Sequence, residues 1–204
     1  MDITFLLRGL VIGFSIAAPV GPIGVLCIRR TLVEGRVSGL VSGLGAATAD
    51  AIYGCVAGFG LTFISNFLVG QQIKLRLIGG VFLCYLGLKT LLAKPAEQAA
   101  LAKEKSLVSA CASTFFLTLT NPLTIISFAA IFAGLGLAST SGDYKLAGVL
   151  VLGVFIGSAL WWFILSYGVG LFREKINNHG FQWVNKISGA IIIGFGLFAL
   201  LSAV

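Results

Sequence analysis

Residues 3–28 read ITFLLRGLVIGFSIAAPVGPIGVLCI, an apolar run that carries one charge, Arg8, and prolines at positions 19 and 22. A helix needs about 20 apolar residues to cross a bilayer, so this run is long enough to span one. Proline removes a helical hydrogen bond and clashes with the preceding turn, so we expect a break near Pro19 and Pro22. Residues 1–7 lack the Lys or Arg of a signal peptide, and we interpret the run as a retained first helix.

The remaining sequence has the same character. Of 204 residues, 58% are hydrophobic and only 10% are charged, whereas about 25% of the residues of a soluble domain are charged. Because the apolar runs do not alternate with polar residues, they predict helices rather than barrel strands. The sequence therefore predicts an all-α integral membrane protein, one domain over residues 1–204, with six transmembrane helices. The five further runs are residues 37–61, 75–92, 107–137, 146–172 and 183–204.

Lys and Arg are distributed unequally between the segments that join these runs. Ten of the 14 lie in the first, third and fifth connections. Since cytoplasmic loops are enriched in Lys and Arg, we expect these connections in the cytoplasm and both termini outside. The third connection, residues 93–106, is the only extended polar linker. We interpret Arg29 and Arg30, in the first connection, as loop charges that set this orientation.

The two halves of the chain share one architecture. Residues 1–92 and 107–204 each contain three apolar runs, and the first run of each half contains proline, Pro19 and Pro22 in one and Pro122 in the other. Because each half crosses the membrane an odd number of times, the second half would be inverted relative to the first. We therefore expect two inverted repeats with proline-broken helices 1 and 4. Broken helices at matching positions of inverted halves are typical of transporters with a midplane binding site. Two incidental kinks are the alternative interpretation.

Asp50 is the one acidic residue deep inside an apolar run. An ionisable group at such depth costs about 2.5–3.5 kcal/mol to insert, which indicates a function: pairing with a substrate ammonium or carrying a coupling proton. A structural carboxylate packed against a broken helix is the alternative. Tyr53 follows one helical turn later and shares the same face. Asn121 directly precedes Pro122, where its amide would either bind substrate or repair the break.

Three stretches together resemble a known family. Residues 18–22, APVGP, followed by Arg29 and Arg30, resemble the first span of the LysE/RhtB family of amino-acid exporters. Residues 39–53, GLVSGLGAATADAIY, resemble its second span, and residues 120–122, TNP, its fourth. The resemblance implies proton-driven export of amino acids or close derivatives across a bacterial inner membrane, without a cofactor. The positions that match the family motifs are Pro19, Gly21, Pro22, Asp50, Asn121 and Pro122.

Two other functions remain open. A divalent metal exporter of related fold would need further carboxylates or thiolates beside Asp50. A non-transporting membrane subunit or a thiol-electron carrier would show either a continuous packed core without a cavity or a cysteine pair beside the breaks, and Cys27 and Cys111 do not occupy corresponding positions.

Enzymatic and nucleic-acid-binding functions are not expected. The sequence contains no nucleophile–base arrangement, phosphate-binding loop or metal-ligand spacing, and its basic residues form no face for nucleic acid. The expected partners are an amino acid, protons and lipid. Glycine pairs at 39/43, 54/58 and 153/157 predict close helix packing and leave room for a homodimer. Trp161 and Trp162 are expected to pack, with the lining of a cavity as the alternative interpretation.

Overall fold

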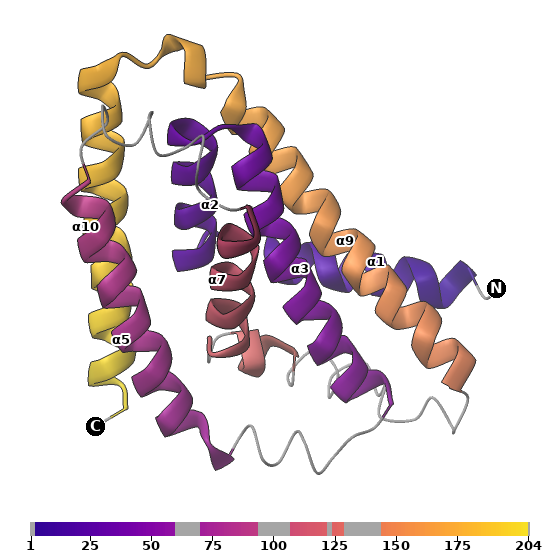
Figure 1. Cartoon of the computed structure of the whole chain (residues 1–204). Helices are drawn as coiled ribbons and strands as arrows, with labels where there is room; N and C mark the ends of the chain where they lie inside the picture. Colours follow the sequence, from indigo (N-terminus) through magenta and orange to yellow (C-terminus); the bar gives the residue numbers. More distant parts are fainter. Residues whose placement is uncertain (1–2, 60–69, 94–106, 122–123, 129–143, 204) are drawn as a thin grey trace.

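The computed structural model describes residues 3–59, 70–93, 107–121, 124–128 and 144–203. Most of these residues are helical and none is in a strand, which confirms the all-α prediction for the described part. Residues 124–128 form a short helical segment. The other elements, drawn in Figure 1, are α1 (Ile3–Ala17), α2 (Pro22–Val33), α3 (Arg36–Gly58), α5 (Gln72–Leu91), α7 (Leu107–Leu119), α9 (Tyr144–Gly170), the 3-10 helix η2 (Arg173–Lys175) and α10 (Asn178–Leu201).

The first predicted span is a broken helix. The axes of α1 and α2 meet at 81° across a break of four residues that contains Pro19. Pro22 occupies the first turn of α2, where its missing N–H would have had no partner within the helix and its fixed φ suits the helix. Gly21 precedes it in an extended conformation. The two prolines therefore break the helix where the sequence predicts.

The number of spans is only partly visible. α3, α9 and α10 are each long and apolar enough to cross a membrane, and the bent pair of α1 and α2 could add a fourth span. α7 ends at Leu119, just before Asn121, as a break at Pro122 would require. Pro122 lies outside the described residues, as do most of the segment 122–143 and the linker residues 94–106. Six spans therefore stay a prediction.

The helices pack in pairs that join distant parts of the chain. α1 runs along α9, α3 packs against both α9 and α7, and α5 packs against α10 (Figure 1). The half-helix α2 contacts α3 on one side and α10 on the other. The residues on either side of the break, Ala17 and Pro22, are buried, whereas Pro19 and Val20 within the break are exposed.

Glycines permit the closest helix contacts. A Cβ at Gly157 would overlap with the backbone carbonyl of Leu10, and a Cβ at Gly153 with that of Leu6. The predicted close-packing role of this glycine pair is therefore confirmed for the contact of α9 with α1. The antiparallel pair α5 and α10 is joined in the same way, through contacts of Gly80 with Gly196 and of Gly87 with Gly189.

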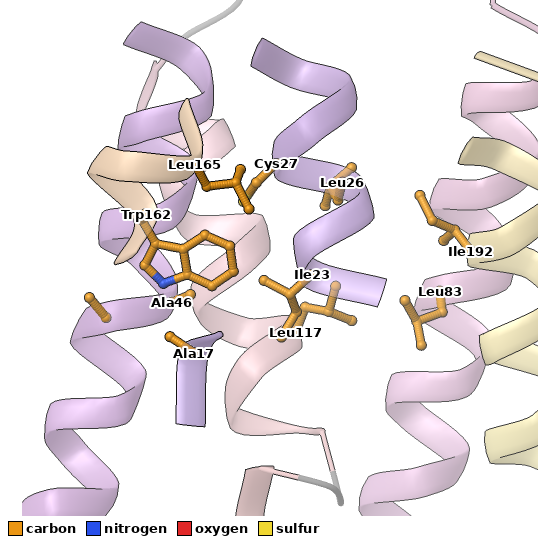
Figure 2. Close-up of a cluster of buried hydrophobic side chains, with 11 residues drawn as sticks. Ala17, Ile23, Leu26, Cys27, Ala46, Leu83, Leu117, Trp162, Leu165 and Ile192 are labelled. Carbon is orange, nitrogen blue, oxygen red and sulfur yellow. The ribbon is translucent and has the colours of Figure 1, made fainter. Parts of the chain in front are cut away.

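The main hydrophobic cluster surrounds α2. Ile23, Leu26 and Cys27 of α2 lie between Trp162 of α9 on one side and Leu83 of α5 on the other (Figure 2). α2 is only half a span long, and Ile23 in its first turn belongs to this hydrophobic cluster. The ends of the broken helix are therefore buried in protein, the setting in which interrupted helices are tolerated at membrane depth.

Candidate functional site

Asp50 lies in the middle of α3 with only 3% of its surface exposed. The Ser158 hydroxyl of α9 donates a hydrogen bond of 2.7 Å to Asp50 Oδ2. Trp162 Nε1, one turn further along α9, donates to Ser158 Oγ at 3.2 Å. No ion pair among the described residues involves Asp50. The carboxyl group is thus oriented by a hydroxyl but not neutralised by a cation of the described protein.

A small cavity of about 60 Å³ opens beside this carboxyl group. Its wall is formed largely by residues at the ends of the broken helices. The lining residues are Ile16, Ala17, Pro19, Gly21, Pro22, Ile23, Gly24, Ala46, Asp50, Thr118, Asn121, Thr124 and Trp162. The structure therefore brings together five of the seven residues that the sequence singles out: Pro19, Gly21, Pro22, Asp50 and Asn121.

The N-terminus of α2 also lines this cavity. Its N-cap residue, Gly21, offers no side-chain acceptor, and Pro22 has no N–H to give. The first available backbone donors are then those of Ile23 and Gly24, which both line the cavity. N–H groups in the first turn of a helix have no partner within it, and the helix dipole is positive there. The cavity thus combines one carboxylate with a helix N-terminus that favours an anion.

Tyr53 shares the face of α3 with Asp50 but does not line the cavity. Its hydroxyl donates a 2.6 Å hydrogen bond to the carbonyl of Leu119, the last residue of α7. Carbonyls at a helix C-terminus lack partners within the helix, so this bond satisfies one of them. Tyr53 therefore holds the end of α7 in place beside Asp50. The remaining sequence candidate, Pro122, is outside the described residues.

Ser158 was not found from the sequence. For Trp162, packing was expected and cavity lining was the alternative; the side chain packs in the α2 cluster, and it also lines the cavity and donates its indole N–H to Ser158. Trp161 does pack, edge-to-face on Phe14 of α1 with ring centroids 5.4 Å apart. The available signal for Ser158 was a hydroxyl within the apolar run of α9, which also contains Ser166. Its pairing with Asp50 could not be read from a sequence because the two residues are 108 positions apart.

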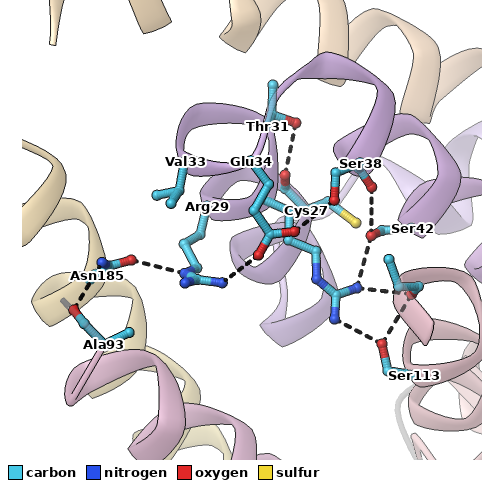
Figure 3. A network of polar contacts seen from close by, with 12 residues as sticks. Cys27, Arg29, Thr31, Val33, Glu34, Ser38, Ser42, Ala93, Ser113 and Asn185 are labelled. Atoms are coloured by element: carbon cyan, nitrogen blue, oxygen red, sulfur yellow. Dashed lines mark hydrogen bonds and ion pairs between the residues drawn. The ribbon is translucent and has the colours of Figure 1, made fainter. Parts of the chain in front are cut away.

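The interpretation of Arg29 and Arg30 as loop charges is wrong. Both belong to α2 and are buried, with 5% and 8% of their surfaces exposed. Arg29 Nε donates to Asn185 Oδ1 of α10 at 2.9 Å, and its Nη1 lies 3.2 Å from a carboxylate oxygen of Glu34 (Figure 3). Ser38 donates to the other oxygen of Glu34 at 2.7 Å.

Arg30 connects α2 to two further helices. Its guanidinium donates to Ser42 Oγ of α3 at 2.8 Å, and to the Ala110 carbonyl and Ser113 Oγ of α7 at 2.9 and 2.8 Å (Figure 3). Together, the two arginines link the C-terminal end of α2 to α3, α7 and α10. This polar network closes the bundle at the end opposite the α1–α2 break.

Replacing Glu34 by Gln should destabilise the fold strongly. The substitution leaves the buried Arg29 guanidinium without its carboxylate, and breaking a buried ion pair costs about 3–5 kcal/mol. Denaturation of the purified protein in detergent would measure the loss. Glu174→Gln, on the exposed 3-10 helix η2, is the matched control and should change the stability by less than about 0.5 kcal/mol. Equal effects of the two substitutions would contradict the role of this network.

Comparison with known proteins identifies the family. The family model described as LysE type translocator matches residues 14–203. The chain belongs to this family. A relative from Bacillus subtilis (strain 168), named "Putative amino acid efflux protein YcgF", is 31% identical over 195 residues, which cover 93% of this chain and 91% of that protein.

More distant relatives are consistent with this assignment. The threonine efflux protein of Escherichia coli (strain K12) is 23% identical over 195 residues, which cover 89% of this chain and 90% of that protein. A membrane protein of Synechocystis, slr1627, is 27% identical over 199 residues, or 92% of each chain. No solved structure matches the chain. The resemblance of the three motif stretches to the LysE/RhtB family is confirmed, and the chain is a membrane protein of a transporter family.

Two structural features bear on metal export and on thiol-electron transfer, the two other functions considered from the sequence. Within the described part of the chain, no three His, Cys, Asp or Glu side chains come close enough to hold a metal ion. The four cysteines are free thiols, of which Cys27 is buried in the α2 cluster. Cys27 does not line the Asp50 cavity.

Proposed function

We propose that this LysE-family protein exports amino acids, or close derivatives, from the cytoplasm in exchange for protons. The observation that carries the proposal is a single buried carboxylate, Asp50, in a cavity walled by the ends of broken helices. The names of two relatives, an amino acid efflux protein and a threonine efflux protein, support the substrate class. The proposed site residues are Asp50, Asn121, Pro19, Gly21 and Pro22, with Tyr53 and Pro122 supporting the break.

The two charges of an amino acid match the two poles of this cavity. The substrate ammonium would pair with Asp50, and its carboxylate would accept hydrogen bonds from the N-terminal amides of α2, at Ile23 and Gly24. Discontinuous transporter helices bind anionic substrate groups at their N-termini in this way. Asn121, which also lines the cavity, offers both a donor and an acceptor to the bound molecule.

Competition at Asp50 would couple transport to protons. A buried carboxylate without a cationic partner is unfavourable, so its charge is balanced either by a proton or by the substrate ammonium. The proton and the substrate ammonium bind the same carboxylate oxygens. Binding of the substrate therefore releases the proton, and release of the substrate allows a proton to bind again. Asp50 would thus be the only group needed to exchange one for the other.

We further propose that the chain is one transmembrane unit of six spans, built as two inverted repeats. Adding 108 to a position in α3, or 105 to one in α1, gives its counterpart in α9 or α7. Contacts of α7 with α3 then have counterparts between α1 and α9. The pairs are Gly45–Cys111 with Gly153–Leu6, Ser42–Thr114 with Leu150–Gly9, and Tyr53–Leu119 with Trp161–Phe14.

The antiparallel pair α5 and α10 supports the same two-fold relation. Adding 109 to Gly80 and Gly87 gives Gly189 and Gly196. A two-fold rotation that superposes the halves would therefore map the contact Gly80–Gly196 onto the contact Gly87–Gly189. Adding 108 to Asp50 gives Ser158, its hydrogen-bond partner. The candidate site would therefore lie on the axis between the halves, at the membrane midplane expected for such transporters.

The proposed location is a bacterial inner membrane, with the basic connections in the cytoplasm and both termini outside. The distribution of Lys and Arg along the sequence supports this orientation. The C-terminal end of α2, with its arginine network, would then face the cytoplasm.

Solute counterflow tests the proposed function. Proteoliposomes of the purified protein, loaded with a mixture of unlabelled amino acids, should accumulate labelled amino acid transiently, because an exchanger carries label inward as unlabelled substrate leaves. Protein-free liposomes are the control. Absence of counterflow for every amino acid, together with transport of Mn²⁺ or Cd²⁺, would replace the proposal by metal export.

A further inference from the structure

A second and larger cavity of about 200 Å³ adjoins the Asp50 cavity. It lies between α5 and α10 on one side and the ends of α2 and α7 on the other, and it shares Pro22 and Asn121 with the Asp50 cavity. The two spaces thus meet at residues of the helix breaks.

The partition between the two cavities is thin. Ile23 lines the Asp50 cavity and Leu117 lines the second one, and their side chains lie next to each other between Trp162 and Leu83 (Figure 2). A molecule held by its charged end at Asp50 could therefore extend past Pro22 and Asn121 into the second space.

The second cavity is lined by one face of each of two helices. On α5 the lining residues are Arg76, Gly79, Gly80 and Leu83, spaced three and four residues apart, and α10 contributes a similar stripe that includes Phe195 and Ala199. Apart from Arg76 and Ser202, the lining side chains from these two helices are apolar or absent, and the end of α7 adds Thr120 and Asn121. Its volume of about 200 Å³ exceeds the roughly 150 Å³ of an apolar cavity that takes up benzene, so this one has room for a branched or aromatic side chain.

Arg76 gives the cavity a positive end. Its Nη1 donates to the Ser202 carbonyl at 2.8 Å, while its Nε is buried without a hydrogen-bond partner. Leu83 and Arg76 are seven residues apart, about 10 Å along α5, so the charge lies at the far end of the compartment from Leu83. A cationic side chain entering here would lose its water and meet a like charge.

From this geometry we propose that the second cavity is the side-chain compartment of the substrate site and selects amino acids with uncharged, apolar side chains. This inference rests on the proposed function, since it assumes that the α-amino and α-carboxylate groups bind at Asp50. It excludes lysine and arginine as substrates and favours leucine, isoleucine or phenylalanine.

Counterflow with a panel of labelled amino acids tests the selectivity. Wild-type protein should prefer leucine over lysine by about a hundredfold, the factor that corresponds to burying an unpaired charge at 2.5–3.5 kcal/mol. No transport of any amino acid would refute the proposed function itself. Equal transport of lysine and leucine would refute the side-chain compartment and leave amino-acid transport standing.

Filling the compartment tests its location. Ala199→Leu places extra carbons in the cavity and should lower the ratio of leucine to alanine transport by about tenfold or more. Ala190→Leu, at an exposed position on the same helix, is the matched control and should leave the ratio unchanged. An unchanged ratio in Ala199→Leu would overturn the proposal and assign the cavity to another occupant, such as a lipid chain.

Reversing the charge tests the role of Arg76. Arg76→Glu should raise lysine counterflow relative to leucine by about tenfold or more, because a like charge becomes an opposite one. Lys74→Glu makes the same change at an exposed position of α5 and should not alter the ratio. The same response in both variants would show that surface charge, and not the cavity, sets the preference.

Discussion

Asp50→Asn should abolish proton-driven export of amino acids, lowering the rate by about a hundredfold or more. The substitution preserves the size of the side chain and a partner for Ser158, whose hydroxyl now bonds the carboxylate at 2.7 Å. It removes the negative charge, and loss of one partner from a buried charge pair costs about 2–5 kcal/mol. Efflux from proteoliposomes under an imposed pH gradient would measure the effect.

Counterflow of the same variant separates the two roles of Asp50. If Asp50 binds the substrate ammonium, counterflow is lost together with gradient-driven efflux. If it carries only the proton, counterflow continues while the gradient no longer drives efflux. Glu174→Gln, which removes an exposed carboxylate, is the control and should behave as wild type. Full gradient-driven efflux by Asp50→Asn would remove this residue from the mechanism.

Gly157→Leu should prevent α1 and α9 from packing and destabilise the protein by about 3 kcal/mol or more. Even a Cβ at this position would overlap with the carbonyl of Leu10, and backbone atoms cannot move aside as side-chain atoms do. The yield of monodisperse protein in detergent and its thermal midpoint would report the loss.

Gly148→Leu is the matched control, because a Cβ added to this glycine of α9 would have no neighbouring atom within 4 Å. It should retain nearly the wild-type midpoint. Gly45→Leu, at the position that the proposed repeat equates with Gly153, should be as damaging as Gly153→Leu, since both would overlap with a backbone carbonyl of a neighbouring helix. Tolerance of Gly157→Leu would contradict the close contact of α1 with α9.

Local sequence signals were sufficient for the helix break and for the deep acid. Pro19 and Pro22 act on their own turns of helix, so the position of the bend follows from two residues. Asp50 stood out because an ionisable group within an apolar run is costly to insert into a membrane and therefore rare. That these residues line one cavity with Asn121 was expected from the idea of paired breaks, and the described residues do bring them together.

Contacts between distant helices were not accessible in the same way. Arg29 and Arg30 follow an apolar run, a pattern that fits a loop as well as it fits a buried network. Their acceptors on α3, α7 and α10 include residues up to 156 positions away. The second cavity likewise depends on how α5 and α10 face α2 and α7, which periodicity within each helix does not determine.

The most direct test of the account is efflux of labelled amino acids from preloaded bacterial cells. Cells with the wild-type protein should release at least one amino acid faster than cells without it, and cells with equal amounts of Asp50→Asn in the membrane should release it at the background rate. Equal release from all three would contradict amino-acid export through the Asp50 cavity.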